Sequence, residues 1–509
     1  MSAPLDVAPL TGWRLFAGAL ALGLANFVVV LDTTIANVSV PHIAGGLAVS
    51  PTQGTWAITS YAVADAITVP LTGWLAARFG SVRWYLISLV GFALFSFLCG
   101  IAWTLDALIV FRVLQGLSGG PLMPLSQTLL MRVFPKEKAG VALAVWAMTT
   151  TSAPIIGPIL GGLISDNLSW HWIFFINLPI VAICLAAVWT MIRRYDPPTE
   201  YKRIDAVGLC LLVVAVGAFQ IMLDTGREND WFDSNWIIGL AIVAAVGIAA
   251  FVIWELTDNE PIVDLRVFRY RSLTAGTAAV SLGFGAYFAS VVLTPLWLQQ
   301  MVGYTATQAG LTVAWAGVLA VALAPVAGRL LPRVDLRIMV TAGIVWLAAT
   351  SLLRSGWTAD AGYWTLALPQ LVQGAGMPFF FMGLTQLALA GVPAREVVSA
   401  AGLMSFMRTL SGAVGTAVAT TAWDNHARVA RNEIAGALND PASAAARLES
   451  TGLSAEQARG SIERLVDIQA FTVGMIHIYI WAAIAFLVAA ACVWIAPRAK
   501  LGGAPKAAH

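Results

Sequence analysis

The stretch VVVLDTTIANVSVP, residues 28–41, places an aspartate, Asp32, inside an apolar segment. The basic residue nearest to it in the sequence is Arg14. An ionised carboxylate in the middle of a membrane helix costs about 3 kcal/mol on insertion scales, so it is stable there only when a proton or a cation neutralises it. The length of the apolar segment around Asp32 therefore decides whether this segment crosses a membrane, and with it whether the carboxylate needs a proton or a cation to neutralise it.

This apolar segment covers about residues 13–38, and a helix needs about 20 residues to cross a bilayer. Comparable runs follow at about 54–76, 84–103, 107–131, 139–164, 172–192, 205–224, 236–256, 272–298, 307–331, 338–353, 363–390, 396–423 and 474–496. The whole chain is 59% hydrophobic and only 11% charged, far more apolar than a soluble protein requires. The pattern predicts an all-α integral membrane protein with fourteen transmembrane helices.

Basic residues predict the orientation. If the N-terminus is cytoplasmic, 20 of the 29 lysines and arginines fall in inner segments, whereas the short outer loops hold only Arg227 and Arg354. Cytoplasmic loops carry an excess of Lys and Arg, so we expect both termini in the cytoplasm. The formal net charge of +2 argues against an extended nucleic-acid surface.

The sequence lacks the residue patterns that disulfides, metal sites, nucleotide binding or catalysis would require. The four cysteines lie singly in apolar runs and are interpreted as small core residues, not as a disulfide framework or a zinc site. No phosphate-binding GxxxxGK[ST] motif occurs, and no cluster of catalytic carboxylates, nucleophiles or metal ligands is found. We therefore expect no enzyme activity, no ATPase, no cofactor and no metal.

The two halves of the chain repeat each other. Seven features of the first half have counterparts in the same order in the second, at offsets from 254 to 259 residues. The pairs are Pro41 and Pro295, Gln53 and Gln308, Gly73 and Gly328, Arg78 and Arg333, Gln115 and Gln373, Glu137 and Glu396, and Met148 and Met407. Internal repeats are typical of secondary transporters, whose binding site lies near the membrane midplane where the repeats meet.

The repeat suggests a division of the chain. Residues 1–192 form an N-terminal six-helix bundle, and residues 261–509 form a C-terminal one. Between them, residues 193–260 contain the polar linker RRYDPPTEYKRID and two inserted transmembrane helices. The mixed-charge segment 425–471 is expected to be a helical excursion into the periplasm.

Four motifs carry a resemblance to a known family. They are LDTTIANVSVP (31–41), GWLAARFGSVR (73–83), RVLQGLSGG (112–120) and APIIGPILGG (153–162). They resemble the signature motifs of the major facilitator superfamily, in particular the fourteen-span drug:proton antiporters. Further segments extend the likeness to nearly the whole chain, which resembles the EmrB-type multidrug efflux permeases of Gram-negative inner membranes. The resemblance implies export of hydrophobic or amphipathic drugs in exchange for protons, by alternating access.

The resemblance assigns proton handling to Asp32 and Arg112, which should lie at similar depth in one bundle. Pairing with a guanidinium favours the ionised carboxylate and dry isolation favours the protonated one, so a change in separation would couple proton release to conformation. The alternative is that Asp32 is a permanently bonded contact between helices. Asp65, in the second span, is a further candidate for proton coupling, or it sets the charge of the substrate.

Two motifs concern the backbone and the loops. APIIGPILGG supplies the antiporter-motif residues Pro154, Gly157, Pro158, Gly161 and Gly162. They predict a kinked, closely packed fifth span, or only a generic small-residue packing face. The cytoplasmic-gate candidates are Gly73, Arg78, Arg83 and Arg333. Ala77 stands where many members of the superfamily have an acid, so these arginines form a gate or only follow the distribution of positive charge.

Polar, aromatic and sulfur-containing residues in the spans are candidates for the substrate cavity, because soft and aromatic surfaces adapt to varied ligands. The candidates are Gln115, Gln127, Trp146, Met148, Gln373, Phe380, Met404 and Arg408. The alternative is that these side chains bond or pack only between helices.

The resemblance also implies partners: a periplasmic membrane-fusion adaptor and an outer-membrane channel, with the bilayer, protons and hydrophobic small molecules. Residues 425–471 then either dock the adaptor or form a solvated hairpin. Three other functions remain open: export of fatty acids or another metabolite, import, and a transport-inactive sensor or scaffold.

Overall fold

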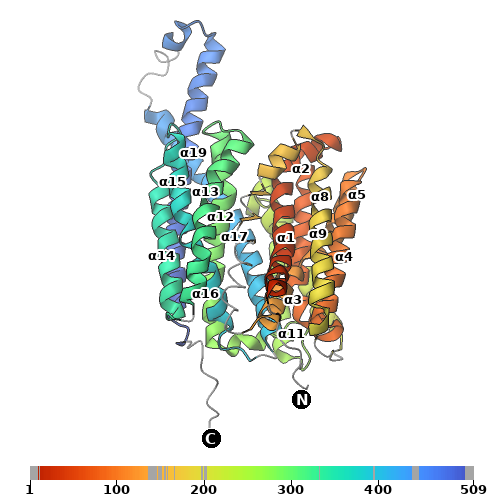
Figure 1. Cartoon of the computed structure of the whole chain (residues 1–509). Helices are drawn as coiled ribbons and strands as arrows, with labels where there is room; N and C mark the ends of the chain where they lie inside the picture. Colours follow the sequence, from red (N-terminus) through yellow and green to blue (C-terminus); the bar gives the residue numbers. More distant parts are fainter. Residues whose placement is uncertain are drawn as a thin grey trace.

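The computed structural model describes residues 10, 12–135, 146, 149, 152–153, 156–157, 159–165, 167–196, 199, 203–331, 333–393, 396–437 and 446–498. Within these residues every regular element is a helix, and eleven helices are long and apolar enough to cross a membrane. The all-α membrane fold is therefore confirmed (Figure 1). Each predicted span except the fifth coincides with described helices, and most of the fifth lies outside the described residues.

The first half contains α1 (Trp13–Gly46), α2 (Pro51–Gly54), α3 (Trp56–Phe79), α4 (Ser81–Gly100), α5 (Leu105–Gly119), α6 (Leu122–Val133), α8 (Trp172–Phe175) and α9 (Asn177–Met191). The second half contains α12 (Arg271–Gln300), α13 (Ala306–Leu330), α14 (Leu336–Arg354), α15 (Tyr363–Gly374), α16 (Met377–Leu389), α17 (Val397–Ala437) and α19 (Ala455–Val493). Between the halves lie α10 (Ala206–Thr225) and α11 (Asn235–Thr257), with short 3₁₀ turns η2 (Arg193–Tyr195), η3 (Arg227–Asn229), η4 (Trp231–Asp233) and η5 (Leu265–Arg269).

The sequence repeat has a matching structure at the start of the second span of each half. Ser50 and Gln53 exchange side chain–backbone hydrogen bonds of 3.0 and 3.2 Å. Thr305 and Gln308 form the same reciprocal pair with the same two distances. Each pair satisfies backbone N–H groups that a helix start leaves without partners. The glutamines at offset 255 therefore have one structural role, which supports descent of the halves from one unit.

A second repeated feature is the close approach of two helices in each half. A Cβ on Gly116 of α5 would lie 2.5 Å from the carbonyl oxygen of Tyr61 in α3. A Cβ on Gly374 of α15 would lie 2.0 Å from the carbonyl oxygen of Ala316 in α13. Both separations are shorter than van der Waals contact, so only glycine allows the helices to pack this closely. This constraint explains the repeated Gln-Gly pair.

The inserted helices touch both halves. α10 packs on α11 and also contacts α3 and α17. The turn between the inserted helices is tied to α17 by the ion pair of Arg227 with Asp424, 2.6 Å, and by a 2.9 Å hydrogen bond from Trp231 Nε1 to Thr421 Oγ1. The pair α10–α11 is thus part of the packed assembly and does not stand apart in the lipid.

Two helices are much longer than a bilayer is thick. α17 has 41 residues and α19 has 39, which correspond to about 60 Å each at 1.5 Å per residue, against about 30 Å for the hydrocarbon core. Figure 1 shows their ends projecting as a hairpin from one end of the assembly. The ion pair of Arg431 with Asp467, 3.0 Å, joins the two helices within this projection. The start of α1 and the end of α19 lie at the opposite end, here named the termini end.

Two sequence-based placements are wrong. Arg354, expected in an outer loop, is the last residue of α14, and only 1% of its surface is exposed. The helix continues past the end of the apolar run and turns this side chain inward. Of the four cysteines interpreted as core residues, Cys99 and Cys184 are buried, but Cys210 is exposed and Cys492 is partly exposed.

Replacing either repeated glycine by alanine should destabilise the protein, because the added methyl group would collide with a helix backbone. We expect Gly116→Ala and Gly374→Ala each to lower the thermal unfolding midpoint of the purified protein, at a cost of about 1–3 kcal/mol. Gly436→Ala in α17 is the matched control, since a Cβ at this position would have nothing within 4 Å. This control should leave the midpoint unchanged or raise it. Equal midpoints for all three variants would contradict the close helix approach.

Candidate functional site

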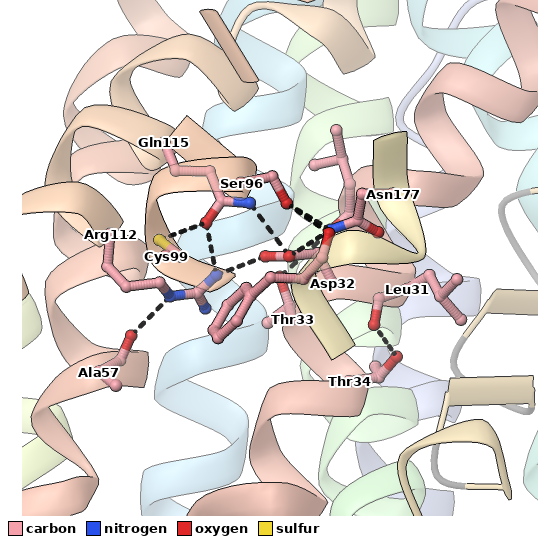
Figure 2. A network of polar contacts seen from close by, with 12 residues as sticks. Leu31, Asp32, Thr33, Thr34, Ala57, Ser96, Cys99, Arg112, Gln115 and Asn177 are labelled. Atoms are coloured by element: carbon pink, nitrogen blue, oxygen red, sulfur yellow. Dashed lines mark hydrogen bonds and ion pairs between the residues drawn. The ribbon is translucent and has the colours of Figure 1, made fainter. Parts of the chain in front are cut away.

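Asp32 of α1 and Arg112 of α5 form a buried ion pair, as their predicted depths require (Figure 2). Arg112 Nη1 donates a hydrogen bond to Asp32 Oδ2. Asp32 is 2% exposed and Arg112 is fully buried. Two opposite charges in a low-dielectric interior attract strongly, which offsets part of the cost of removing both from water.

Two amides complete the shell of the carboxylate. Gln115 Nε2 and Asn177 Nδ2 donate to Asp32 Oδ1 over 3.1 and 2.7 Å. Asn177 Nδ2 also donates to Ser96 Oγ over 3.0 Å, and the Ser96 hydroxyl donates to the carbonyl of Phe174. Figure 2 shows these groups gathered around Asp32. Asn177 and Ser96 were not predicted from the sequence, where their only signal was a polar residue within an apolar run.

Arg112 is held from its other side by α3. Its Nε donates to the carbonyl oxygen of Ala57 over 2.8 Å, and its Nη1 donates to Gln115 Oε1 over 2.9 Å. The guanidinium carbon lies 4.3 Å from the centre of the Tyr61 ring. Its Nη2 has no hydrogen-bond partner among the described residues. Arg112 therefore connects the carboxylate on α1 with the backbone of α3.

The ion pair constrains what the network can do chemically. Asp32 accepts three hydrogen bonds, from Arg112, Gln115 and Asn177, so both of its carboxylate oxygens are engaged. Arg112 is the one partner among these three that carries a charge. Removing either member of the ion pair leaves the other charge buried without compensation, at a cost of about 3–5 kcal/mol. The geometry permits a proton switch and equally permits a permanent contact.

Two further residues of opposite charge lie on neighbouring helices of the two halves. Asp65 is on α3 and Arg408 is on α17, and these two helices pack directly against each other. The sequence-based hypothesis grouped Asp65 with Asp32 and Arg112, whereas the cation near enough to influence Asp65 is Arg408 of the other half, without a direct ion pair between the two side chains among the described residues. Arg408 is 7% exposed, and its guanidinium carbon lies 5.5 and 6.0 Å from the ring centres of Phe284 and Trp146.

Buried polar atoms without hydrogen-bond partners lie on helices that face each other across the boundary between the two halves. Arg408 Nη2 and Ser405 Oγ on α17, and both side-chain amide atoms of Gln127 on α6, have no hydrogen-bond partner among the described residues. α6 and α17 pack against each other. A buried polar atom without a partner costs about 1–3 kcal/mol, so such atoms call for water or a ligand. The region between the halves is therefore the best candidate for the transport site.

The other predicted cavity residues are dispersed. Gln115 belongs to the Asp32 network, and Gln373 lines a separate pocket inside the second half. Phe380 and Met404 are 1% and 2% exposed and belong to the packed hydrophobic core. Trp146 donates to Ser126 Oγ over 2.8 Å and lies near Arg408, whereas Met148 lies outside the described residues. The structure thus brings together Trp146 and Arg408, and it places Gln127 on a helix that packs against α17.

The described part of the fifth span packs tightly on α1. A Cβ on Gly157 would lie 2.0 Å from Thr34 Oγ1, and one on Gly161 would lie 3.1 Å from the carbonyl oxygen of Ile35. Gly162 is buried. Pro154 and Pro158, and therefore the expected kink, lie outside the described residues. The small residues of the motif thus bring this span next to the residues that follow Asp32.

Three gate candidates lie near the junction of α3 and α4: Gly73 and Arg78 in α3, and Arg83 in α4. The fourth, Arg333, lies between α13 and α14 in the second half. A Cβ on Gly73 would lie 2.9 Å from Ser399 Oγ, so the halves touch at this position. Arg78 lies over the Trp74 ring at 5.5 Å, whereas Arg83 and Arg333 are exposed.

An acid that was not predicted from the sequence reaches this loop from the linker. Asp196 accepts hydrogen bonds from the backbone N–H groups of Val82 and Arg83, over 2.9 and 3.3 Å, and so caps the start of α4. Gly80 has φ of +93°, and a Cβ there would lie 2.6 Å from the Asp196 carboxylate, so glycine is required. In the second half Asp335 caps α14 in the same way, and the hydrogen bond from the Arg337 side chain lowers the pKa of Asp335.

Comparison with known proteins agrees with this geometry. Residues 22–416 match the family model of the Major Facilitator Superfamily. The multidrug export protein EmrB of Haemophilus influenzae is 46% identical over 493 residues, covering 96% of this chain and 97% of that protein. EmrB of Escherichia coli is 45% identical, covering 98% and 99%. The fatty acid resistance protein FarB of Neisseria gonorrhoeae is 44% identical, also covering 98% and 99%.

Solved structures support the fold. A proton:xylose symporter, XylE, aligns with a TM-score of 0.59 at 13% identity, covering 95% of both chains. A bacterial homologue of the lysosomal transporter Spinster aligns with a TM-score of 0.58 at 12% identity, covering 98% of this chain and all of the other. The helix architecture, the family model and the identity over nearly the whole length lead to one conclusion. The chain is a multi-pass membrane transporter of the major facilitator superfamily and belongs to the family of EmrB multidrug export proteins.

Proposed function

We propose that this protein exports hydrophobic and amphipathic drugs in exchange for protons, by alternating access between its two halves. The observation that carries the proposal is the packing of α3 on α17, which places Asp65 and Arg408 on facing helices of the two halves, together with buried polar atoms on α6 and α17 that have no partner among the described residues. The rings of Trp146 and Phe284 next to Arg408 offer apolar surface at the same place. The EmrB relatives, named as multidrug export proteins, support the same substrate class.

The coupling step follows from competition for one carboxylate. Ionised Asp65 can pair with Arg408 or with a cationic drug, and a proton on Asp65 removes both attractions. Drug entry from one side therefore displaces the proton, and proton entry from the other side displaces the drug. Because Asp65 and Arg408 belong to opposite halves, each change also alters the attraction that holds the halves together.

The Asp32 network responds through α3. Arg112 binds the carbonyl of Ala57, two turns before Asp65 on the same helix. A shift of α3 relative to α1 therefore pulls Arg112 away from Asp32, and the isolated carboxylate then takes up a proton. In this proposal both carboxylates titrate, Asp65 in contact with the drug and Asp32 as the proton site that senses the position of α3.

The proposal also covers the orientation of the protein in the membrane and the proteins that bind it. The termini end carries the Arg78, Arg83 and Arg333 segments, so it faces the cytoplasm of a bacterium, and the hairpin projects into the periplasm. Val429 of α17 and Leu465 of α19, on the two arms of the hairpin, are 57% and 59% exposed. We propose that these exposed apolar side chains contact a periplasmic membrane-fusion adaptor, which leads to an outer-membrane channel.

A second substrate class has its own support. FarB, named a fatty acid resistance protein, is as similar to this chain as the multidrug relatives are. Export of amphipathic acids is therefore a candidate alongside export of cationic or neutral drugs. Competition between decanoate and ethidium for transport in proteoliposomes would show whether one pathway carries both.

Substitutions in the Asp32 network should separate stability from transport. We expect Asp32→Asn and Arg112→Gln each to lower the thermal unfolding midpoint, because each leaves a buried partner without its counterion. The double variant should lose less than the sum of the two. In proteoliposomes with an imposed pH gradient, Asp32→Asn should abolish ethidium exchange. Asp106→Asn, an exposed change on α5, is the control and should match the wild type. Exchange by Asp32→Asn at the wild-type rate and pH dependence would refute a proton role for Asp32.

Substitution of Asp65 and substitution of Arg408 should have opposite effects on the affinity for a cationic drug. Asp65→Asn should weaken equilibrium binding of the cation ethidium about tenfold or more, through loss of a charged partner, and make it independent of pH. Arg408→Gln should strengthen ethidium binding, because it removes the cation that competes for Asp65. Fluorescence titration of the purified protein measures both. Unchanged affinity in both variants would contradict competition at Asp65.

The hairpin surface should matter for assembly but not for transport itself. Val429→Glu with Leu465→Glu should abolish co-purification of a co-expressed periplasmic adaptor, because it places charge on the exposed apolar face. The same variant should exchange ethidium at the wild-type rate in proteoliposomes. Glu449→Ala is the control and should retain the adaptor. Retention of the adaptor by the double glutamate variant would exclude this surface.

A further inference from the structure

Arg354 is a buried cation for which the described part of the chain offers no carboxylate. Its exposed fraction is 1%, and its guanidinium carbon lies 4.7 Å from the centre of the neutral Tyr479 ring. Its Nη2 donates to Ser351 Oγ over 3.2 Å and its Nε lies 3.4 Å from the carbonyl oxygen of Thr350. No acid among the described residues lies within ion-pair distance of it. Buried charges in proteins are normally paired, so this one requires an explanation.

A small pocket opens onto Arg354 inside the second half. Its surface is mainly apolar and includes Val291 and Met377, among which Arg354, Gln370, Gln373 and Ser290 place polar groups. The free volume for the centre of a water-sized group is about 10 Å³, enough for one such group. The amides of the two glutamines can donate hydrogen bonds to an anion, and the guanidinium supplies the charge. The pocket therefore fits a small anion or a single anionic headgroup, and it is too small for a whole drug molecule.

The repeat shows what is missing here. At the offset that relates Gln115 to Gln373, Arg112 corresponds to Gln370, and at the offset that relates Pro41 to Pro295, Asp32 corresponds to Ala286. The first half thus contains a cation, a glutamine and an internal carboxylate. The second half retains the glutamine and has a cation, supplied by a different helix, but its described residues supply no carboxylate to the pocket.

Local contacts compensate Arg354 only in part. The Tyr479 ring centre lies 4.7 Å from the guanidinium carbon, and the negative face of an aromatic ring attracts a cation. The C-terminal end of α14 contributes roughly half a negative charge from its backbone carbonyls. Neither supplies the full opposite charge that Asp32 gives Arg112.

We propose that the pocket at Arg354 binds a monovalent anion, which completes in the second half the ion pair that the first half builds from its own residues. The anion is either free, such as chloride, or the carboxylate headgroup of an amphipathic acid. Arg354 supplies the charge, and the side-chain amides of Gln370 and Gln373 supply hydrogen bonds. The hydroxyl of Ser290 already donates to the carbonyl oxygen of Ala286, and that of Thr294 is hydrogen-bonded to Tyr479 Oη. This inference concerns equilibrium binding and does not depend on proton-driven export.

The test uses the purified full chain in a sulfate buffer free of chloride and carboxylates, because sulfate is divalent and larger than the proposed ligand. Isothermal titration measures binding of chloride, of decanoate, and of decan-1-ol, which has the same chain length without the carboxylate. Arg354→Gln should weaken anion binding about tenfold or more, through loss of a charge-assisted hydrogen bond, while decan-1-ol binding stays unchanged. Arg354→Lys should retain most of the affinity. Arg271→Gln, at an exposed position, is the matched control.

The results distinguish a free anion from the carboxylate headgroup of an amphipathic acid. Loss of chloride binding alone in Arg354→Gln identifies a free anion, and loss of decanoate binding alone identifies a carboxylate headgroup. Anion binding that is absent in the wild type, or equal in the wild type and Arg354→Gln, overturns the proposal. If Arg354→Gln does not fold, Ser290→Asp decides: its carboxylate should occupy the pocket, abolish anion binding and raise the thermal unfolding midpoint. Wild-type anion binding by Ser290→Asp overturns the proposal as well.

Discussion

The ion pair between Asp32 and Arg112 is the contact on which the arrangement of the first half depends. Both charges are almost completely removed from water, so each needs the other, and the remaining lone pairs of the carboxylate need Gln115 and Asn177. These partners come from α1, α5 and α9, and Arg112 also binds α3. A network of this kind holds the four helices in one relative position, and a shift of α3 relative to α1 would break it.

The second pair of charges extends this constraint across the molecule. Asp65 and Arg408 lie on α3 and α17, which belong to different halves and pack against each other. α3 thus carries both the backbone carbonyl that holds Arg112 and the carboxylate that interacts with Arg408. This shared helix is the physical basis for coupling a proton on one carboxylate to the separation of the halves.

The sequence was sufficient for the overall fold and for part of the site. Apolar runs of bilayer length and paired motifs predicted the helices, and the depths of Asp32 and Arg112 predicted that they would meet. Asn177 was missed because one polar residue in an apolar run has no period or motif that marks it. Arg354 was misplaced because the apolar run ends before it, whereas the helix continues and turns it inward. Asp196 and the partner of Asp65 depend on contacts between distant segments, which one sequence does not contain.

We propose that a drug and a proton compete for Asp65, and that Asp32 takes up a proton when α3 moves. The most direct measurement is the number of protons released when ethidium is added to the purified, weakly buffered protein in detergent. We expect release by the wild type, none or almost none by Asp65→Asn, and a reduced amount by Asp32→Asn. Equal release by all three proteins would contradict this competition.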